Sequence, residues 1–385
     1  MKGAFASAVI GATLVSGLAL ATAKGAAAAP LEGLPAYDHV FVLVLENESF
    51  ASTFGTSSPA HYLNNTLVPA GVLDDQYYAT GHVSLDNYVA MTSAQPPVNA
   101  EQDSDCVTVS LYACAQTTLS FSGGANIADQ LETAGVSWKG YMDSMPSPCF
   151  HQMYAPTTVA PDPYQGDSQT PPATDYADRH NPFNYYPDIV GDDTRCQAHV
   201  RPYSEFATDL AANTVPGYAF ITPDTCHDGH DATCSNGNPG GLVAADAWLQ
   251  TNVPPILSYI NAHNGLLIVT FDEGASSDTS GCCHGGPGGA MGAGGRIGLV
   301  ALGPGVKAGQ TVHTPYDHAS QLRTVEDLFG IGTYLNNAAS SSPMSDLFAS
   351  PAAATPETPF TAGLVLLGVG AAAGAWRLFR RRRRA

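Results

Sequence analysis

The sequence predicts an α/β fold with a mostly parallel sheet, organised as one doubly wound domain. Continuous apolar runs at 39–45 and 266–271 are typical of parallel strands that helices cover on both faces. Strand-like and helical patterns also alternate along the chain, as they do in doubly wound folds. Strands are expected at 38–45, 217–222, 265–271 and 297–302, and helices near the start of 57–72, at 125–134 and at 241–263.

Both apolar runs lead straight into acidic residues. Glu46 and Asn47 follow the first run, and Asp272 and Glu273 follow the second. Open α/β sheets bind ligands at the carboxyl ends of their strands, so these four side chains are expected to meet at one edge. Grouped carboxylates repel one another unless a cation lies between them, and oxygen ligands suit a hard divalent metal. The sequence therefore predicts a metal site at this edge.

The composition indicates one globular domain with appendages. The chain has 385 residues, a formal net charge of −19 and 44% hydrophobic residues. We expect the catalytic domain to cover 30–349. An acidic domain repels nucleic acid, so nucleic acid is excluded as a partner.

The two ends of the chain have the patterns of an exported and anchored protein. A lysine, an uncharged stretch and small residues make 1–29 a predicted signal peptide. Residues 350–359 are rich in Pro and Ala and read as a linker. Residues 360–385 combine an uncharged run, long enough to span roughly 25 Å as a helix, with an arginine cluster. This predicts a transmembrane helix with a cytoplasmic arginine-rich tail, which holds the domain at the extracellular face. A sorting tail, a buried terminal helix and processing near 355–358 are the alternatives.

Eight cysteines in an exported chain indicate disulfides. Cys282 and Cys283 are adjacent and cannot bond without strain, so their pairing is the least predictable. A cysteine zinc site is disfavoured because the chain has no CxxC pair. Proximity suggests the pairs Cys106–Cys114, Cys149–Cys196 and Cys226–Cys234.

A turn-like segment at 81–88 contains a candidate nucleophile. Ser84 could attack an electrophile if a metal or base lowers its pKa, and Asn87 could donate to an oxyanion. Most serines in such segments only cap helices or form turns. Two segments with little periodicity, 149–201 and 274–295, are expected to be long ordered loops over the site.

Histidines in two further segments, 227–230 and 317–318, are candidates for the site. His227 and His230 lie just after the strand expected at 217–222, where a histidine beside aspartates suits metal ligation or protonation of a leaving group. Asp317 could cap the helix that follows it. His318 would then lie at the positive end of that helix, where an anion binds.

Three blocks resemble the signature motifs of the bacterial phosphoesterase family, which contains acid phosphatases and phospholipases C and belongs to the alkaline phosphatase superfamily. The blocks are 39–50, 270–274 and 316–330, in this order, and the likeness extends from about 38 to 334. The resemblance implies a three-layer α/β/α sandwich. It also implies that Glu46, Asn47, Asp272 and Glu273 surround a divalent metal.

The same resemblance assigns Ser84 as the nucleophile and Asn87 as a phosphate ligand. A proline often precedes that asparagine in related enzymes, whereas Asp86 stands there in this chain, and Thr80 is the reserve nucleophile. The His-Asp-Gly triplet that begins at His227 resembles that of secreted acid phosphatases and implies a phosphate ligand or leaving-group acid. In the last block, Asp317 replaces the usual asparagine.

Together these features predict an exported, metal-dependent acid phosphatase that acts on phosphate monoesters, either small molecules or lipids. The metal must supply positive charge because the domain has few basic residues. Ser84 would form a phosphoserine, His227 would protonate the departing alkoxide, and His318 and His230 would bind phosphate oxygens. Asp224, Asp246 and His230 are candidates for a second metal. The alternatives are a phospholipase C and a non-catalytic surface protein. The sequence leaves open the metal, the number of ions and the oligomeric state.

Overall fold

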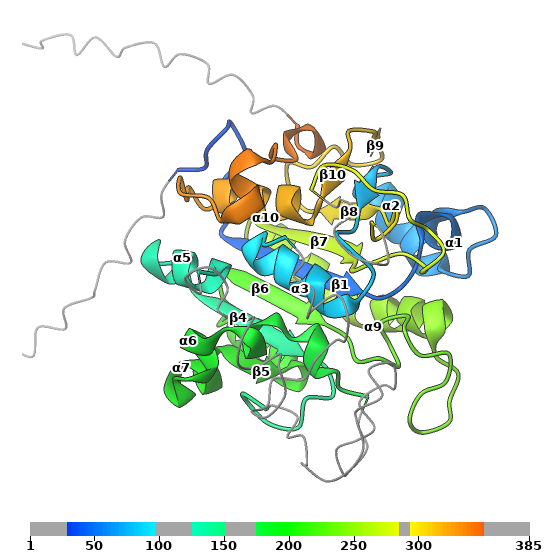
Figure 1. Ribbon diagram of the computed structural model, residues 1–385, viewed down its shortest axis with the longest axis horizontal. Coiled ribbons are helices and arrows are strands. Elements are labelled where there is room, and N and C mark those ends of the chain that lie inside the picture. The colour runs from blue at the N-terminus through cyan, green and yellow to red at the C-terminus, as the bar shows by residue number, and fades with distance from the viewer. Residues whose placement is uncertain (1–28, 97–124, 151–174, 285–292, 350–385) are drawn as a thin grey trace, which may run out of the picture. The chain divides into compact units, whose positions relative to one another are not determined.

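The computed structural model describes residues 29–96, 125–150, 175–284 and 293–349. An eight-stranded sheet has the order β5–β4–β6–β1–β7–β8–β2–β9, and a separate two-stranded sheet pairs β10 with β3 (Figure 1). The strands are β1 His39–Leu45, β2 Val72–Asp74, β3 Tyr77–Tyr78, β4 Trp138–Met142, β5 Val200–Pro202, β6 Tyr218–Thr222, β7 Gly265–Phe271, β8 Leu299–Leu302, β9 Thr311–Val312 and β10 Tyr316–Asp317.

Neighbouring strands of the large sheet run parallel except at β8, which is antiparallel to both β7 and β2. The predicted α/β class with a mostly parallel sheet is therefore confirmed. β1 and β7 pair in register along their whole length, up to Leu45 opposite Phe271. Because the two strands end together, the residues that follow them leave the sheet side by side. This register places the acidic residues at one edge, as the sequence predicts.

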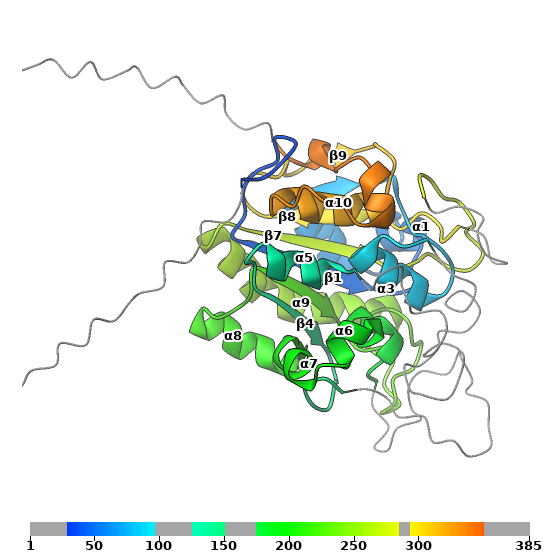
Figure 2. The same cartoon turned by 60° about the vertical axis from the view of Figure 1, so that its left-hand side comes forward.

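Helices cover both faces of the large sheet. Residues paired in register share a face, so Val42 and Phe220 point the same way, whereas Phe41 points to the opposite face. The Phe220 ring contacts Tyr88 of α3 (Ser84–Ser93), and α10 (His318–Leu328) packs against α3. The Phe41 ring contacts Phe206 of α8 (Phe206–Ala212), and α9 (Gly241–Ala262) packs against β7. Figure 2 shows α3 and α10 together on one side of the strands. The three-layer arrangement is thus present.

Two of the three predicted helices form as expected. The segment 241–263 becomes α9, despite Pro254 and Pro255 inside it, and 125–134 becomes α5 (Ile127–Thr133), which Asn126 caps. The segment 57–72 is helical from 61 to 70, where a π-helical turn, Leu63–Leu67, continues into the short α2 (Val68–Ala70). The sequence gives no sign of α3, because all of its residues are buried and no polar stripe marks it. The remaining α-helices in the described ranges are α1 Phe50–Phe54, α6 Pro187–Val190 and α7 Asp193–His199.

Within the described part of the chain, three disulfides join the six cysteines. Cys149–Cys196 and Cys226–Cys234 confirm the predicted pairs. Cys282 and Cys283, whose pairing the sequence leaves least predictable, are bonded to each other. Cys106 and Cys114 lie outside the described residues, so that pair stays a prediction.

The expected membrane anchor requires a correction. Within the described ranges, every helix is too short or too polar to cross a membrane. The segment 360–385, for which we expected the anchor, lies outside those ranges, and so does most of the expected signal peptide. Anchoring at the extracellular face of a membrane is therefore not supported and is withdrawn.

Candidate active site

The ends of β1 and β7 bring Glu46, Asn47, Asp272 and Glu273 together. The Oδ1 atom of Asp272 accepts hydrogen bonds from the backbone amides of Asn47, at 3.0 Å, and Glu273, at 2.5 Å. Asn47 has a positive φ of 56°, which turns the chain sharply after Glu46. The convergence that the sequence predicts is therefore present in the fold. The role of these residues as metal ligands stays a prediction.

Burial makes this edge electrostatically unfavourable without a counter-charge. Both Glu46 and Asp272 are fully buried. Burial, together with repulsion from Asp272 and Asp228, raises the pKa of Glu46 well above its usual range. Burial also raises the pKa of Asp272, although the amide of Asn47 opposes this. The Oδ2 atom of Asp272 is buried and has no hydrogen-bond partner among the described residues. Buried carboxylates with spare oxygen atoms are what a hard divalent cation requires, so the residues fit such an ion.

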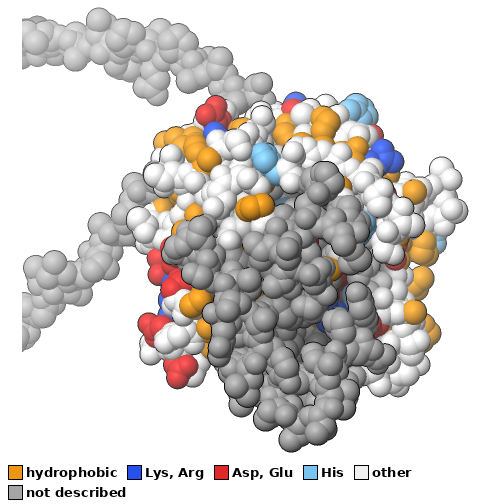
Figure 3. All heavy atoms as spheres, in the orientation of Figure 1, with side chains coloured by type: hydrophobic (Ala, Val, Ile, Leu, Met, Phe, Trp, Pro, Cys, Tyr) orange, Lys and Arg blue, Asp and Glu red, His pale blue; other side chains and the backbone are white. Residues whose placement is uncertain are grey.

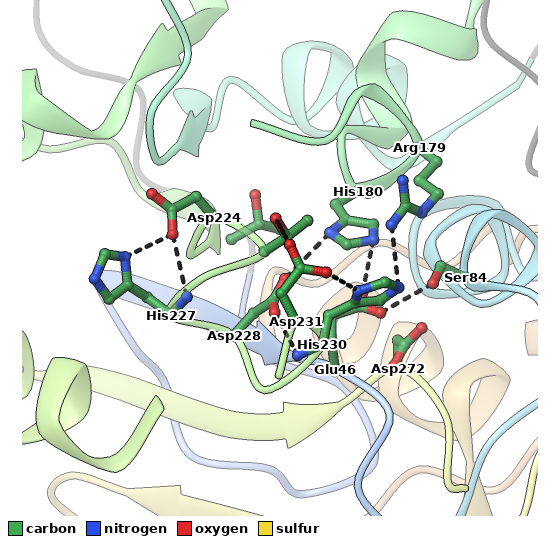
Figure 4. A network of polar contacts seen from close by, with 12 residues as sticks. Glu46, Ser84, Arg179, His180, Asp224, His227, Asp228, His230, Asp231 and Asp272 are labelled. Carbon is green, nitrogen blue, oxygen red and sulfur yellow. Dashed lines mark hydrogen bonds and ion pairs between the residues drawn. The ribbon is translucent and has the colours of Figure 1, made fainter. Parts of the chain in front are cut away.

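Ser84 lies beside this acidic group. Its Oγ donates a hydrogen bond of 2.9 Å to Oε2 of Glu46 (Figure 4). Ser84 is buried and is the first residue of α3, so its hydroxyl lies at the positive end of a ten-residue helix. An oxyanion or a phosphoryl group would be stabilised at such a helix start. The structure therefore brings the predicted nucleophile to the predicted metal ligands.

Asn87 holds the turn that presents Ser84. Its Oδ1 accepts hydrogen bonds from the amides of Thr80 and Gly81, at 2.9 and 3.1 Å, and its Nδ2 donates to the carbonyl oxygens of Gly81 and Val83. These contacts use the hydrogen-bonding groups of the amide inside the turn. They support a positioning role better than the predicted phosphate-ligand role, which stays a prediction.

A buried chain of polar side chains extends from Glu46 in the other direction, and sequence reasoning missed it. His180 lies between two carboxylates, with Nε2 3.3 Å from Glu46 and Nδ1 3.3 Å from Asp228. Its ring stacks on Tyr88, whose hydroxyl donates to Glu46 at 2.5 Å. Burial lowers the pKa of His180 well below its usual range, with Arg179 acting in the same direction. The ligand atoms of Glu46, His180 and Asp228 also lie within 4.8 Å of one another, so these residues could share a cation.

Arg179 and His230 complete this side of the site. The Arg179 guanidinium lies 3.2 Å from Nε2 of His230, and His230 contacts Asp231 through Nδ1 at 2.8 Å. The guanidinium is close enough to Glu46 and Asp228 to counter the rise in pKa of both carboxyl groups. One signal could have revealed this segment. In a chain with only 15 Lys and Arg, an Arg-His pair inside an otherwise uninformative loop is unusual.

His227 takes no part in these contacts. Its Nδ1 pairs with Asp224 at 2.6 Å, and Figure 4 shows its ring directed away from Ser84 and Glu46. The hydrogen bond that the His227 ring donates to Asp224 raises the pKa of His227 above its usual value. Its predicted role as leaving-group acid stays a prediction. Asp246 is another candidate ligand for a second metal. Its carboxylate accepts hydrogen bonds from the backbone amides of Tyr62 and Leu63, each at 2.8 Å.

His318 contacts the backbone of Asp272, one of the predicted metal ligands. Its Nε2 donates to the backbone oxygen of Asp272 at 2.7 Å, and its Nδ1 lies 2.9 Å from the hydroxyl of Tyr77. A carbonyl oxygen only accepts, so Nε2 carries the proton. The Tyr77 hydroxyl also donates to Oε1 of Gln321 at 3.0 Å. Burial lowers the pKa of His318 to about 4, so the ring is neutral near pH 7. Both ring nitrogens therefore have protein partners, and phosphate binding by His318 stays a prediction.

Comparisons with known proteins fit this geometry. The sequence profile of the Phosphoesterase family matches residues 59–332. A probable acid phosphatase of Kluyveromyces lactis is 27% identical over 317 residues, which cover 81% of this chain and 62% of that protein. A phosphatidylinositol-3-phosphatase of Mycobacterium tuberculosis is 25% identical over 300 residues, which cover 77% of this chain and 79% of that protein. The crystal structure of a sulfatase from Pseudoalteromonas sp. superposes with a TM-score of 0.50 at 14% identity, over 82% of this chain and 72% of that chain, and this likeness concerns the fold alone. The chain thus spans less than two thirds of one of these curated relatives.

Proposed function

Because the chain belongs to the Phosphoesterase family and is a phosphoric ester hydrolase, we propose that it is a metal-dependent phosphatase that attacks phosphate monoesters with Ser84. The single observation that carries the proposal is the hydrogen bond from Ser84 to Glu46 beside the buried carboxylate of Asp272. A serine at the start of a helix, next to buried carboxylates that need a cation, has the surroundings of an activated nucleophile.

Ser84 attacks phosphorus while the bond from phosphorus to the substrate's alcohol oxygen breaks, so the alcohol leaves and Ser84 becomes a phosphoserine. Water then hydrolyses the phosphoserine to inorganic phosphate and free Ser84. Its hydroxyl proton already points at the Glu46 carboxylate, which can accept it as the bond to phosphorus forms. Tyr88 and His180 hold that carboxylate from its other side, so the serine keeps a fixed direction. Phosphoryl transfer depends mainly on such positioning and on neutralising charge.

Glu46, Asn47, Asp272 and Glu273 would hold the divalent metal, with His180 and Asp228 as further candidates. When bound, the ion would supply the positive charge that the phosphate oxygens need and would lower the pKa of the serine hydroxyl. The number of ions and their identity are open in this proposal.

Arg179 is proposed to bind the phosphate group of the substrate, and His230, whose two ring nitrogens contact Arg179 and Asp231, is proposed to hold the guanidinium in place. Both face the buried carboxylates from the loop side, and Arg179 can donate two parallel hydrogen bonds to a phosphate. The described surface supports a small or lipid ester rather than nucleic acid. Figure 3 shows acidic side chains gathered near α6 and α7, where Asp188, Asp192 and Asp193 are exposed, and few basic side chains on this face.

The relatives that are named acid phosphatases support hydrolysis of monoesters, and the phosphatidylinositol-3-phosphatase supports a lipid monoester as one possible substrate class. The test is a rapidly quenched reaction with radioactive phosphate monoester, run with added Mg²⁺, Mn²⁺ or Zn²⁺ and with a chelator. We expect metal-dependent turnover and label on Ser84, which Ser84→Ala abolishes. Thr80→Ala is the matched control and should retain both. Turnover by Ser84→Ala would overturn the nucleophile, and full activity after removal of metal would overturn the metal requirement.

A further inference from the structure

Two consecutive residues at the start of α10 hold both ends of the segment 272–284, which we call the strap. His318 donates to the backbone oxygen of Asp272, where the strap begins. Asp317 accepts from the backbone amide of His284 at 2.8 Å, where the strap ends, and lies 3.2 Å from the ring Nδ1 of His284. The same short element therefore fixes the two ends of a 13-residue segment (272–284).

The strap contains two of the candidate metal ligands and also contacts the turn that presents Ser84. His82, two residues before Ser84, lies 3.2 Å from Glu273 through Nδ1 and 2.8 Å from the backbone oxygen of Asp278 through Nε2. The amide of Ala275 donates to the hydroxyl of Ser49 at 2.9 Å. A shift of the strap would therefore move the Glu273 carboxylate and the turn before α3 together.

The carboxylate of Asp317 makes two contacts, one with the start of α10 and one with His284, and an asparagine could not make both. Its Oδ1 caps α10 by accepting from the amide of Ser320 at 2.9 Å, and its Oδ2 faces His284. The side chain is buried. An asparagine that kept the cap would turn its Nδ2 donor toward the donating amide of His284. The aspartate at this position, where the family usually has asparagine, therefore matches the histidine at the far end of the strap.

We propose that His284 and Asp317 are positioning residues, which lock the strap and thereby set the affinity of the site for its divalent metal. This inference rests on the proposed function, because it assumes that Asp272 and Glu273 bind the metal. Partners behind metal ligands commonly have this effect, since they fix the ligand's orientation before the ion arrives.

The groups around His284 and Asp317 favour an ionic contact between them that is strongest at low pH. The hydrogen bond with Asp317 raises the pKa of His284, and contacts with His284 lower the pKa of Asp317 although burial opposes this. The groups that face the pair are Ser340 and Ser341 beside His284, and Tyr77 and His318 beside Asp317. Among these neighbours, His318 is neutral near pH 7. A raised histidine pKa means that the ionic contact is complete below the ordinary value and is lost as the pH rises through the raised value.

The experiment uses the full-length protein, freed of metal by a chelator and titrated with Mg²⁺, Mn²⁺ and Zn²⁺ separately. The metal concentration that gives half of the maximal rise in Tm is measured for each ion, in the absence of substrate. The variants are His284→Ala, Asp317→Asn and the double variant, with His284→Gln as the conservative change. His313→Ala is the matched control, because His313 forms a similar pair with Asp75 at 2.9 Å on the exposed surface.

We expect His284→Ala and Asp317→Asn each to raise the half-saturating metal concentration about 10-fold. The double variant should be no worse than either single variant, His284→Gln should recover part of the loss, and His313→Ala should match the parent. The difference between His284→Ala and the parent should be larger near pH 5 than near pH 8. Unchanged metal binding in His284→Ala, or an equal loss in His313→Ala, overturns the inference while leaving the proposed function intact. A parent protein that binds none of the three ions overturns both.

Discussion

The backbone amide of Asn47 donates a hydrogen bond of 3.0 Å to the carboxylate of Asp272, although 225 positions separate the two residues. This contact joins the first residues beyond β1 and β7 into one unit. It also uses one oxygen of Asp272 and leaves the other buried, with no hydrogen-bond partner in the described part of the chain. The fold thus keeps a carboxylate oxygen available at considerable electrostatic cost.

Glu46→Gln and Asp272→Asn should each abolish most activity and reduce bound metal, while the metal-free protein becomes more stable at pH 7. The reason is that both carboxylates are buried and have raised pKa values, so removing a charge relieves repulsion. Denaturation by urea in chelator and measurement of bound metal check both effects. Asp246→Ala is the contrast, because Asp246 only holds two backbone amides: it should lose about 1 kcal/mol of stability and keep its activity. A fall in metal-free stability for Asp272→Asn would contradict the prediction.

Arg179→Gln should raise KM for a phosphate monoester and the inhibition constant of inorganic phosphate by about 10- to 100-fold, the equivalent of one charge-assisted hydrogen bond. The guanidinium faces the site beside His230, and little other positive charge is available in this chain. Steady-state kinetics and phosphate inhibition provide the test. Arg201→Gln, which removes a partly exposed pair with Glu205, is the control. If both variants keep the parent's KM, Arg179 does not bind substrate.

His227→Ala should keep the alkaline limb of the pH–rate profile. A leaving-group acid must reach the ester oxygen, whereas the His227 ring pairs with Asp224 and is directed away from Ser84. The raised pKa of His227 then affects only stability, which this pair supports at low pH and loses as the pH rises through the raised value. The profiles of kcat/KM at saturating metal should overlap for parent and variant. Loss of the limb in the variant would restore His227 as the leaving-group acid.

The free energy of unfolding should decrease between about pH 4.5 and pH 7 because of Glu326. This residue is fully buried in α10, and burial raises its pKa to about 7 from 4.5. Between these values the folded protein holds a proton that the unfolded chain has lost, so stability falls as the pH rises, by roughly 3 kcal/mol at most. Glu326→Gln keeps an acceptor for the amide of Leu335 and should flatten this slope. Urea denaturation at pH 5 and pH 7.5 measures the slope, and Glu205→Gln is the control. An unchanged slope in Glu326→Gln would assign the effect to another group, such as Asp74, whose pKa burial raises to about 8.

Much of the fold could be read from local patterns. The apolar runs of β1 and β7 are long, uninterrupted and followed by acids, so both the parallel sheet and the meeting of Glu46 with Asp272 follow from period and position alone. The cap of α10 by Asp317 was equally readable, because it depends on neighbours three residues apart. In contrast, α3 has no polar stripe, and the strands β2 and β5, of three residues each, are too short to stand out in the sequence.

The sequence by itself therefore determined which side chains follow the ends of the two central strands, β1 and β7. Strand direction and burial can be read from the local pattern of residues. What only the tertiary structure decided is which distant side chains surround them. His180 reaches Glu46 from a single 3-10 turn in a segment without periodicity, His227 turns away although its motif suggested chemistry, and His284 meets Asp317 across 33 positions. These outcomes depend on how loops pack against the sheet edge, and packing of that kind is fixed by contacts between residues far apart in the chain rather than by any local pattern.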